Sequence, residues 1–333
     1  MDNQRIRIFD LHCDTLDRLA LHTAFPDVEF EDFVMGTPKD RLLSLADNDA
    51  HISLDRMQAQ DYAWCQCFAA FIPDELNSDQ AWAVFQAVRS YLQGQIAEHA
   101  DRIEQVLDAR NIRSIVETGH CAAMFTVEGG SFIEGTVERV HEIADAGVKM
   151  LTLAWNGPNA IASGHDTTEG LTPFGREVIA ALEERHVVID VSHLNDRGFW
   201  DVLEASERPF AASHSNSRAI CGHLRNLTDD QFRALAERGG IVGLNFCEDF
   251  ITEDLPATQD DFLRHVDHLL QLGGEHVLAL GSDYDGCEVP TWLDPAEKIG
   301  TLHGLLAGEF GEDIADRICF ENACEFFERN ETL

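Results

Sequence analysis

Residues 189–193 (IDVSH) and 212–216 (ASHSN) decide between the folds open to this sequence, because in each a short apolar run leads into a histidine. Similar apolar runs recur along the chain and alternate with helical patterns. This alternation predicts βα units and a parallel sheet. We expect eight strands, within residues 7–12, 64–72, 122–128, 149–155, 187–193, 210–214, 241–246 and 277–283.

A closed (β/α)8 barrel and a doubly wound open sheet share this periodicity. Chemically competent side chains end at least six of the eight runs, and no glycine-rich dinucleotide loop follows an early run. Ligands gather at the carboxyl ends of all strands in a barrel, so the sequence favours the barrel. We expect one domain over residues 1–333, with residues 24–51 as an insertion that covers the barrel mouth after strand one. The helical patterns lie at 78–109, 173–185, 228–238, 260–272 and 295–307.

The composition excludes some classes of partner. The chain has 60 acidic and 24 basic residues, a formal charge of -36, which argues against nucleic acid or an anionic membrane as a partner. No apolar run approaches the length of a membrane span, and the first strand begins too close to Met1 for a signal peptide. We therefore expect a cytoplasmic protein whose nine cysteines are reduced thiols.

The first predicted strand ends in residues 9–14, FDLHCD. Two-residue alternation places Asp10, His12 and Asp14 on one side, and an imidazole beside a carboxylate can bind a divalent ion. Cys13 faces the other way and is expected to fill space. A His-x-Asp pattern alone is weak evidence for a metal site, because the pattern is common by chance.

Three further candidate ligands end other strands. Glu128 ends strand three just before two glycines, and its carboxylate has two oxygens that can bridge two metals. His193 and His214 end strands five and six, which are neighbours in a barrel. A single such residue is more often structural, a helix cap in the case of Glu128. Together with His12 and Asp14 they exceed the ligands of one tetrahedral zinc, so a pair of metals sharing Glu128 explains them better.

Two kinds of charged residue are further candidates: aspartates for proton transfer and arginines for substrate binding. Asp283 and Asp285 lie in residues 281–286, GSDYDG, and either can serve as acid–base group, although Asp-Gly is also a common turn. We favour Asp283 because it ends the apolar run. An arginine in the loop that holds Arg218 and Arg225 can bind a substrate carboxylate, or can simply be solvated.

These motifs together resemble the membrane (renal-type) dipeptidases, peptidase family M19 of the amidohydrolase superfamily. The resemblance runs in order from the first strand to the eighth. It rests on residues 10–14 (DLHCD), 128–130 (EGG), 189–193 (IDVSH), 213–215 (SHS), 225–226 (RN) and 281–286 (GSDYDG).

The resemblance implies a binuclear zinc dipeptidase and a homodimer. It implies that His12 and Asp14 hold one zinc, that His193 and His214 hold the other, and that Glu128 bridges them. Members of the family commonly accept dipeptides with a C-terminal D-residue, and some cleave dehydropeptides or β-lactams. Manganese and cobalt accept the same ligands, so the ligand set leaves the metal open.

The same resemblance implies that Asp283 is the proton shuttle and that Arg225 binds the C-terminal carboxylate of the substrate. The family often has a histidine just after strand four, where this chain has Trp155 in residues 151–157, LTLAWNG. We expect Trp155 and Asn156 to contact the substrate, and Asn156 or His165 to replace that histidine, unless the substrate range differs.

The expected mechanism uses a water between the two metals, which becomes hydroxide near neutral pH and attacks the peptide carbonyl. Two alternatives stay open. One is a lactonase, phosphotriesterase or amidase on the same barrel. Lactonases and phosphotriesterases commonly use a carboxylated lysine near the end of strand four, whereas Lys149 lies at the beginning of that strand, which disfavours these two types. A barrel that binds metal or peptide without catalysis is the other.

Overall fold

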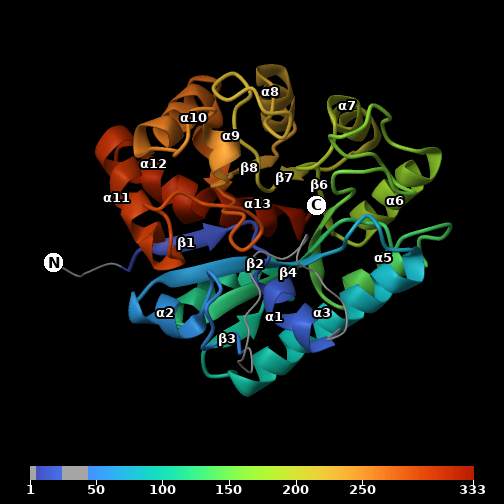
Figure 1. Ribbon diagram of the computed structural model, residues 1–333, viewed down its shortest axis with the longest axis horizontal. Coiled ribbons are helices and arrows are strands. Elements are labelled where there is room, and N and C mark those ends of the chain that lie inside the picture. Colours follow the sequence, from blue (N-terminus) through green and yellow to red (C-terminus); the bar gives the residue numbers. More distant parts are fainter. Residues whose placement is uncertain (1–4, 25–43) are drawn as a thin grey trace.

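Eight parallel strands close into a barrel in the computed structural model, which describes residues 5–24 and 44–333 (Figure 1). The strands follow the order β2-β1-β9-β8-β7-β6-β5-β4 around the barrel, and β4 pairs back with β2 in register from Cys65↔Ala122 to Phe71↔Glu128. That last pairing closes the sheet. The barrel strands are β1 Arg7–Asp10, β2 Ala63–Phe71, β4 Cys121–Glu128, β5 Val148–Thr152, β6 Val188–Asp190, β7 Ala211–Ala212, β8 Ile241–Leu244 and β9 Leu278–Leu280.

Each of the eight predicted runs overlaps one of these strands, so the predicted barrel is confirmed over the doubly wound sheet. The predicted helix at residues 78–109 is too long. Helix α3 ends at Glu98, and a ninth strand, β3 (Ile103–Gln105), follows it and pairs with β4 at Cys121–Ala123. Hydrogen bonds to the sheet thus replace helical ones over the last part of the predicted helix.

The helices surround the strands (Figure 1). The patterns predicted at 173–185, 228–238 and 260–272 match α6, α8 and α10 to within one residue at each end, and the pattern at 295–307 begins as a 3-10 turn. Thr228 caps α8 and exchanges hydrogen bonds with Gln231, as a capping box does. The helices are α1 Thr15–Ala24, α2 Leu54–Ala59, α3 Ser78–Glu98, α4 Ile112–Glu117, α5 Glu138–Asp145, α6 Pro173–Glu184, α7 Asp196–Ala205, α8 Asp229–Glu237, α9 Glu248–Ile251, α10 Gln259–Gln271, α11 Ile299–Phe310, α12 Glu312–Asp316 and α13 Asn322–Asn330.

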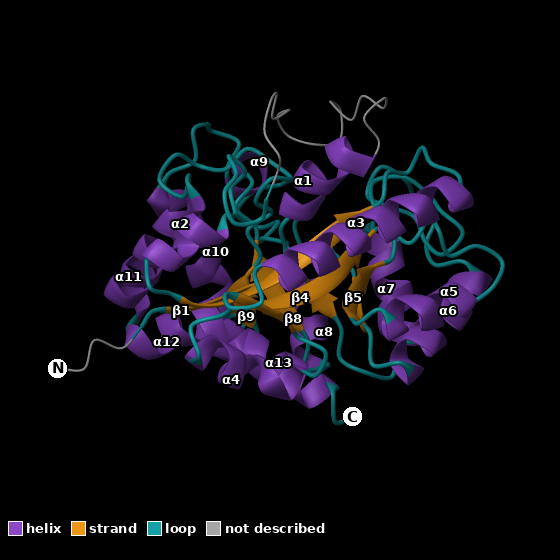
Figure 2. Ribbon diagram, turned by 90° about the horizontal axis from the view of Figure 1, so that it is seen from below, coloured by secondary structure: helices purple, strands orange, loops and turns teal. Residues whose placement is uncertain are grey.

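The C-terminal helical segment closes the amino end of the barrel. Phe9 on β1 stacks on Phe327 of α13 at 5.7 Å between ring centroids, and Phe320 lies 6.2 Å from Phe9. In Figure 2, α4 and α13 lie on one side of the strands, whereas α1, α9 and long loops lie on the other. One end of the barrel is therefore sealed by apolar packing, and the carboxyl ends of the strands are left for the polar groups.

The predicted insertion at residues 24–51 is only partly described. Ala24 is the last residue of α1, and residues 25–43 lie outside the described residues. Residues 44–51 form irregular structure that ends near the strand termini, where the backbone N–H of His51 donates to Asp285 at 2.9 Å. This described end of the segment is thus tied to the loop after β9.

All nine cysteines are free, and eight of them are buried. Cys13 is completely buried in the apolar core, as expected for a space-filling residue. Within the described ranges, every helix is too short or too polar to cross a lipid bilayer.

The charge of -36 makes the stability of this fold depend on salt. Like charges repel most in the compact state, and the screening length falls from about 10 Å at 0.1 M salt to about 3 Å at 1 M. We expect the midpoint of thermal unfolding at pH 7 to rise over that range of sodium chloride, as measured by circular dichroism. A midpoint that stays constant or falls would contradict a fold limited by its own negative charge.

Candidate metal centre

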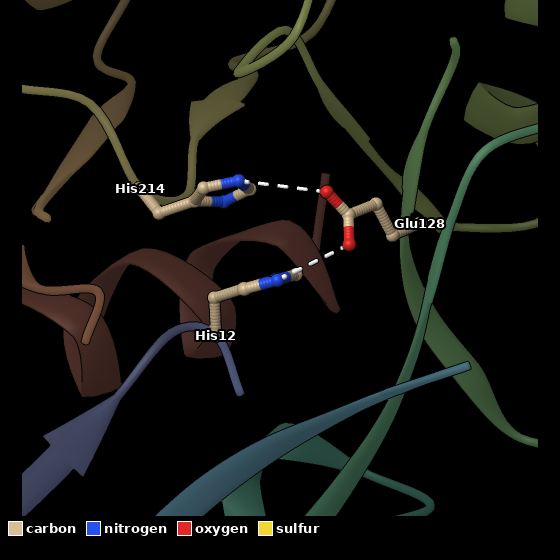
Figure 3. A group of neighbouring side chains, drawn as sticks. All are labelled: His12, Glu128 and His214. Atoms are coloured by element: carbon tan, nitrogen blue, oxygen red, sulfur yellow. Dashed lines mark ion pairs between the residues drawn. The ribbon is translucent and has the colours of Figure 1, made fainter. Parts of the chain in front are cut away.

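Six predicted site residues meet at the carboxyl ends of the barrel strands, and all six are buried. They come from segments far apart in the sequence, as the strand ends of a barrel bring loops from the whole chain together. Figure 3 shows three of them, with the rings of His12 and His214 next to the carboxylate of Glu128. The six are His12 and Asp14 after β1, Glu128 at the end of β4, His193 after β6, His214 after β7 and Asp283 after β9.

The first group of possible ligands consists of His12, Asp14 and one oxygen of Glu128. His12 Nε2 lies 3.3 Å from Asp14 Oδ2 and 3.4 Å from Glu128 Oε2. Ligands of a tetrahedral zinc, with bonds of about 2.0–2.1 Å, lie about 3.3–3.4 Å from one another. These atoms are therefore spaced as the ligands of one metal ion.

The second group uses the other oxygen of the same carboxylate. Glu128 Oε1 lies 2.7 Å from His193 Nε2 and 3.6 Å from His214 Nε2, and the two imidazole nitrogens are 3.0 Å apart. In Figure 3 the two oxygens of Glu128 face different histidines. Each group thus receives one oxygen of Glu128, which is the arrangement that a bridging carboxylate requires.

Hydrogen bonds orient both histidines of the second group. Asn156 Oδ1 accepts from His193 Nδ1 at 3.0 Å. Ser213 Oγ accepts from His214 Nδ1 at 2.7 Å and donates its own proton to Asp190 at 2.6 Å. With the proton on Nδ1, Nε2 of each ring is unprotonated and is the atom that can bind a metal. In this structure Arg225 Nη2 donates to His193 Nε2 at 3.1 Å.

The charges of the cluster also fit a cation. Burial and the nearby carboxylates of Glu128 and Asp283 raise the pKa of Asp14 to about 7, although His12 opposes this. His12 Nε2 and Asp14 Oδ1 are buried without a hydrogen-bond partner. Buried polar atoms are rarely left unpaired, so a divalent cation between these atoms would satisfy both and remove the repulsion between carboxylates.

Asp283 and Asp285 are only two residues apart but occupy different places. Both have a positive φ, 62° and 68°, which aspartate tolerates better than most residues. Asp283 Oδ1 lies 3.9 Å from His12 Nε2, and its other oxygen accepts from Asn245 at 2.9 Å. The Asp283 carboxylate is therefore at the cluster, with one oxygen fixed and the other turned to it.

Asp285 is instead part of the scaffold. Its carboxylate accepts hydrogen bonds from Thr15, Arg18 and the backbone N–H of His51, and its own backbone N–H donates to His51 Nδ1 at 2.9 Å. Burial alone raises the pKa of Asp285, but these hydrogen bonds and the charge of His51 together lower it to about 2. Asp285 thus ties α1 and residues 44–51 to the loop after β9.

Asp10 does not reach the cluster, although alternation placed it beside His12. Its carboxylate accepts from the backbone N–H of Ser282 at 2.7 Å, from the Ser282 hydroxyl at 2.6 Å and from Gln66 at 2.7 Å. Regular strand pairing of β1 ends at Asp10, so the two-residue alternation does not extend to His12. Asp10 holds the backbone immediately before Asp283.

A cavity of about 300 Å³ opens above the cluster. Trp155 and Phe71 form an apolar part of its lining and meet edge to face at 5.0 Å between ring centroids. Arg225 also lines the cavity, although it is 4% exposed, and it lies 5.3 Å from the ring of Phe250. Its guanidinium donates to Ser192 O at 2.5 Å. The cavity thus has a carboxylate and histidine floor, an aromatic part and one arginine.

Two positions that hold the site were missed by the sequence reasoning. Asn245, just after β8, fixes Asp283, and its signal was a polar residue inside the apolar run at 241–246. A Cβ atom on Gly286 would lie 2.2 Å from Asp14 Oδ2 and 2.5 Å from Asp283 Oδ1, so any larger residue there would displace these two carboxylates. Asn156 was predicted to contact substrate, and the structure adds its hydrogen bond to His193.

Comparison with known proteins shows the family of this chain. The profile of the membrane dipeptidases, peptidase family M19, matches residues 3–332. An uncharacterised protein of Klebsiella pneumoniae, described as lying in the pqqA 5' region, is 34% identical over 240 residues, which cover 68% of this chain and 89% of that protein.

Two solved structures are similar over almost the whole chain. A metallopeptidase from Rhodobacter sphaeroides, bound to a phosphinate mimic of the dipeptide L-Ala-D-Ala, has 27% identity and a TM-score of 0.87, covering 98% of this chain and 100% of its own. Dipeptidase AC, a metallopeptidase of family M19, has 28% identity and a TM-score of 0.88, covering 99% and 100%.

Replacing Gly286 with alanine tests the close packing of the cluster. The added Cβ would meet the ends of two side chains, which can move, so we expect Gly286→Ala to fold but to bind zinc at least about tenfold more weakly. Zinc affinity is measured by competition with a chelator. Gly222→Ala is the control, because the nearest atom to its Cβ, Glu253 Oε1, is 3.4 Å away. Equal zinc affinity in both variants would contradict this reading of Gly286.

Proposed function

Because the chain belongs to peptidase family M19, the membrane dipeptidases, we propose that it is a zinc-dependent dipeptidase whose substrates include dipeptides with a C-terminal D-residue. The observation that carries this proposal is Glu128, which directs one carboxylate oxygen to His12 and the other to His193 and His214. The dipeptide mimic bound by the Rhodobacter sphaeroides metallopeptidase supports the substrate class.

Two zinc ions would be held by His12 and Asp14 on one side and by His193 and His214 on the other, with Glu128 shared. When bound, they would supply Lewis-acid activation of water and of the peptide carbonyl. The distances between ligand atoms and the buried, unpaired atoms of His12 and Asp14 fit such ions.

Asp283 is placed to move protons during hydrolysis. Asn245 holds one of its oxygens at 2.9 Å, so the other can take a proton from the attacking water and pass it to the departing amine. Fixing the carboxylate in advance reduces the reorganisation needed in the transition state. Asp285 is not a competitor in this role, because its oxygens are occupied by Thr15, Arg18 and His51.

Arg225 is proposed to bind the C-terminal carboxylate of the dipeptide. It lines the cavity, and its Nε is buried without a hydrogen-bond partner. Its Nη1 donates to Ser192 O and its Nη2 to His193 Nε2 and His214 O, and it lies over the ring of Phe250, so the unpaired Nε is held in a fixed direction. Trp155 and Phe71 then give an apolar surface to the other part of the substrate, and Asn156 lines the cavity beside them.

Other functions of the same barrel have less support. A carboxylated lysine near the end of β5 would indicate a lactonase or phosphotriesterase, but Lys149 lies near the start of that strand and pairs with Glu331 near the C-terminus at 2.5 Å. A barrel that binds metal or peptide without catalysis would not need Asp283 fixed beside the cluster. These alternatives make different predictions for metal content and turnover.

Elemental analysis together with a dipeptide screen tests the proposed function. We expect two zinc ions per chain, and hydrolysis of both L,L and L,D dipeptides that is lost on chelation and restored by zinc. Two bound metals without hydrolysis of any dipeptide would favour a binding protein, and hydrolysis of lactones or of other amides in place of dipeptides would favour the other enzymes.

Asp283→Asn tests the proton shuttle separately from metal binding. Asparagine keeps the shape of the side chain but cannot accept the proton, so we expect both metals to stay and kcat to fall by about 10² to 10⁴. The matched control is Asp285→Asn, which removes a carboxylate of the scaffold and is expected to lower the midpoint of thermal unfolding. Full turnover by Asp283→Asn with both metals bound would rule out the shuttle.

A further inference from the structure

One part of the cavity lining has no role in the proposed hydrolysis. His165, in the loop between β5 and α6, and His223, in the loop between β7 and α8, both line the cavity next to Arg225. Their ring centroids are 6.2 Å apart, and His223 lies 4.5 Å from Phe250, the ring that Arg225 covers. The two histidines and Arg225 thus form one group of nitrogen-bearing side chains, and we call it the histidine wall.

The histidine wall offers hydrogen-bond donors to the cavity. The backbone N–H of Arg225 donates to His223 Nδ1 at 3.2 Å, so a neutral His223 carries its proton on Nε2, which is left as a donor. His165 Nε2 lies 3.5 Å from Asp166 Oδ1, whereas its Nδ1 is buried and has no hydrogen-bond partner. Buried polar atoms without a partner are rare in proteins, and at the edge of a cavity they indicate a group that a ligand pairs.

Arg225 supplies the positive charge of the histidine wall. Burial and the charge of Arg225 lower the pKa of His165 to about 4, and the same two causes lower the pKa of His223. A carboxylate placed here would pair with Arg225 and accept hydrogen bonds from both rings. Charge-assisted hydrogen bonds of this kind are about twice as strong as neutral ones.

Three carboxylates lie on the outer side of the histidine wall, in a second cavity that His165 and His223 also line: Asp166, Asp249 and Glu253. They are exposed to solvent, unlike Arg225, which is 4% exposed. Water and salt screen exposed charges far more than buried ones. Of these four charges, that of Arg225 is therefore screened least.

We propose that His165 and His223, together with Arg225, form a subsite for an anionic side chain, aspartate or glutamate, on the C-terminal residue of the dipeptide. This rests on the proposed dipeptidase function. The α-carboxylate of that residue uses Arg225, and the side-chain carboxylate, a few bonds away on the same residue, uses the two rings. The apolar surface of Trp155 and Phe71 is then left for the N-terminal residue, which selects for an uncharged side chain there.

A matched set of dipeptides tests the subsite on the zinc-loaded protein. Ala-Asp, Ala-Asn and Ala-Lys, each with an L- or D-residue at the C-terminus, differ mainly in the charge of one side chain. We expect kcat/KM for the aspartyl dipeptide to exceed that for the asparaginyl one by about tenfold or more, since a hydrogen bond to a charged group contributes about 1.5–3 kcal/mol and 1.4 kcal/mol is tenfold.

Two substitutions assign the preference to the histidines. His165→Phe keeps a ring without N–H groups, and His223→Asn keeps an acceptor for the Arg225 backbone but loses the Nε2 donor. We expect each to lower the Asp-to-Asn ratio of kcat/KM by about tenfold. His303→Asn on α11, which pairs with Asp316, is the control and should leave the ratio unchanged.

The outcomes separate this inference from the proposed function. A wild-type ratio of one or below, a preference for Ala-Lys, or a ratio that neither histidine substitution alters would overturn the subsite while leaving a dipeptidase. Absence of hydrolysis of every dipeptide would overturn the proposed function itself, and the subsite with it. The wild-type comparison needs no variant, so it decides the charge preference even if a substituted protein fails to fold.

Discussion

The burial of carboxylates beside histidines at one end of the barrel is the constraint on which the rest of the site depends. Asp14, Glu128 and Asp283 lie within a few ångströms of three imidazoles, away from water. Bringing like charges together in a poorly solvated place costs free energy unless a cation compensates them. The neighbouring loops therefore have to hold these side chains in an arrangement that they would not adopt for stability alone.

Buried residues behind the cluster hold its side chains in place through hydrogen bonds. Asp190 holds Ser213, which orients His214, and Asp10 holds Ser282, which directly precedes Asp283. In both cases a buried aspartate accepts the backbone N–H and the hydroxyl of a serine, at the position just before a cluster residue. Both aspartates lie at strand ends, so the rigid sheet sets the positions of the groups beyond it.

The sequence predicted the strands and the cluster because both depend on local patterns. An apolar run that ends in a polar residue can be read along the chain, and the fold then brings those ends together. The roles of Asn245 and Gly286 could not be predicted in this way, because each depends on a contact with a residue far away in sequence, Asp283 and Asp14 respectively. The end of α3 at Glu98 is similar, because pairing of Ile103–Gln105 with β4 is a tertiary contact that helical periodicity does not contain.

The acidic chain as a whole and Arg225 in the cavity act in opposite directions on an anionic substrate. A chain with a charge of -36 repels anions, and salt weakens this repulsion at distances beyond about one screening length. Arg225 is buried, so its attraction acts only on a ligand that has already entered the cavity, where salt screens it little. Long-range repulsion acts on the rate of encounter, whereas Arg225 acts on the bound state. A negative surface and a subsite for an anion are therefore compatible in one molecule, and an acidic dipeptide would gain from salt during association but not once bound.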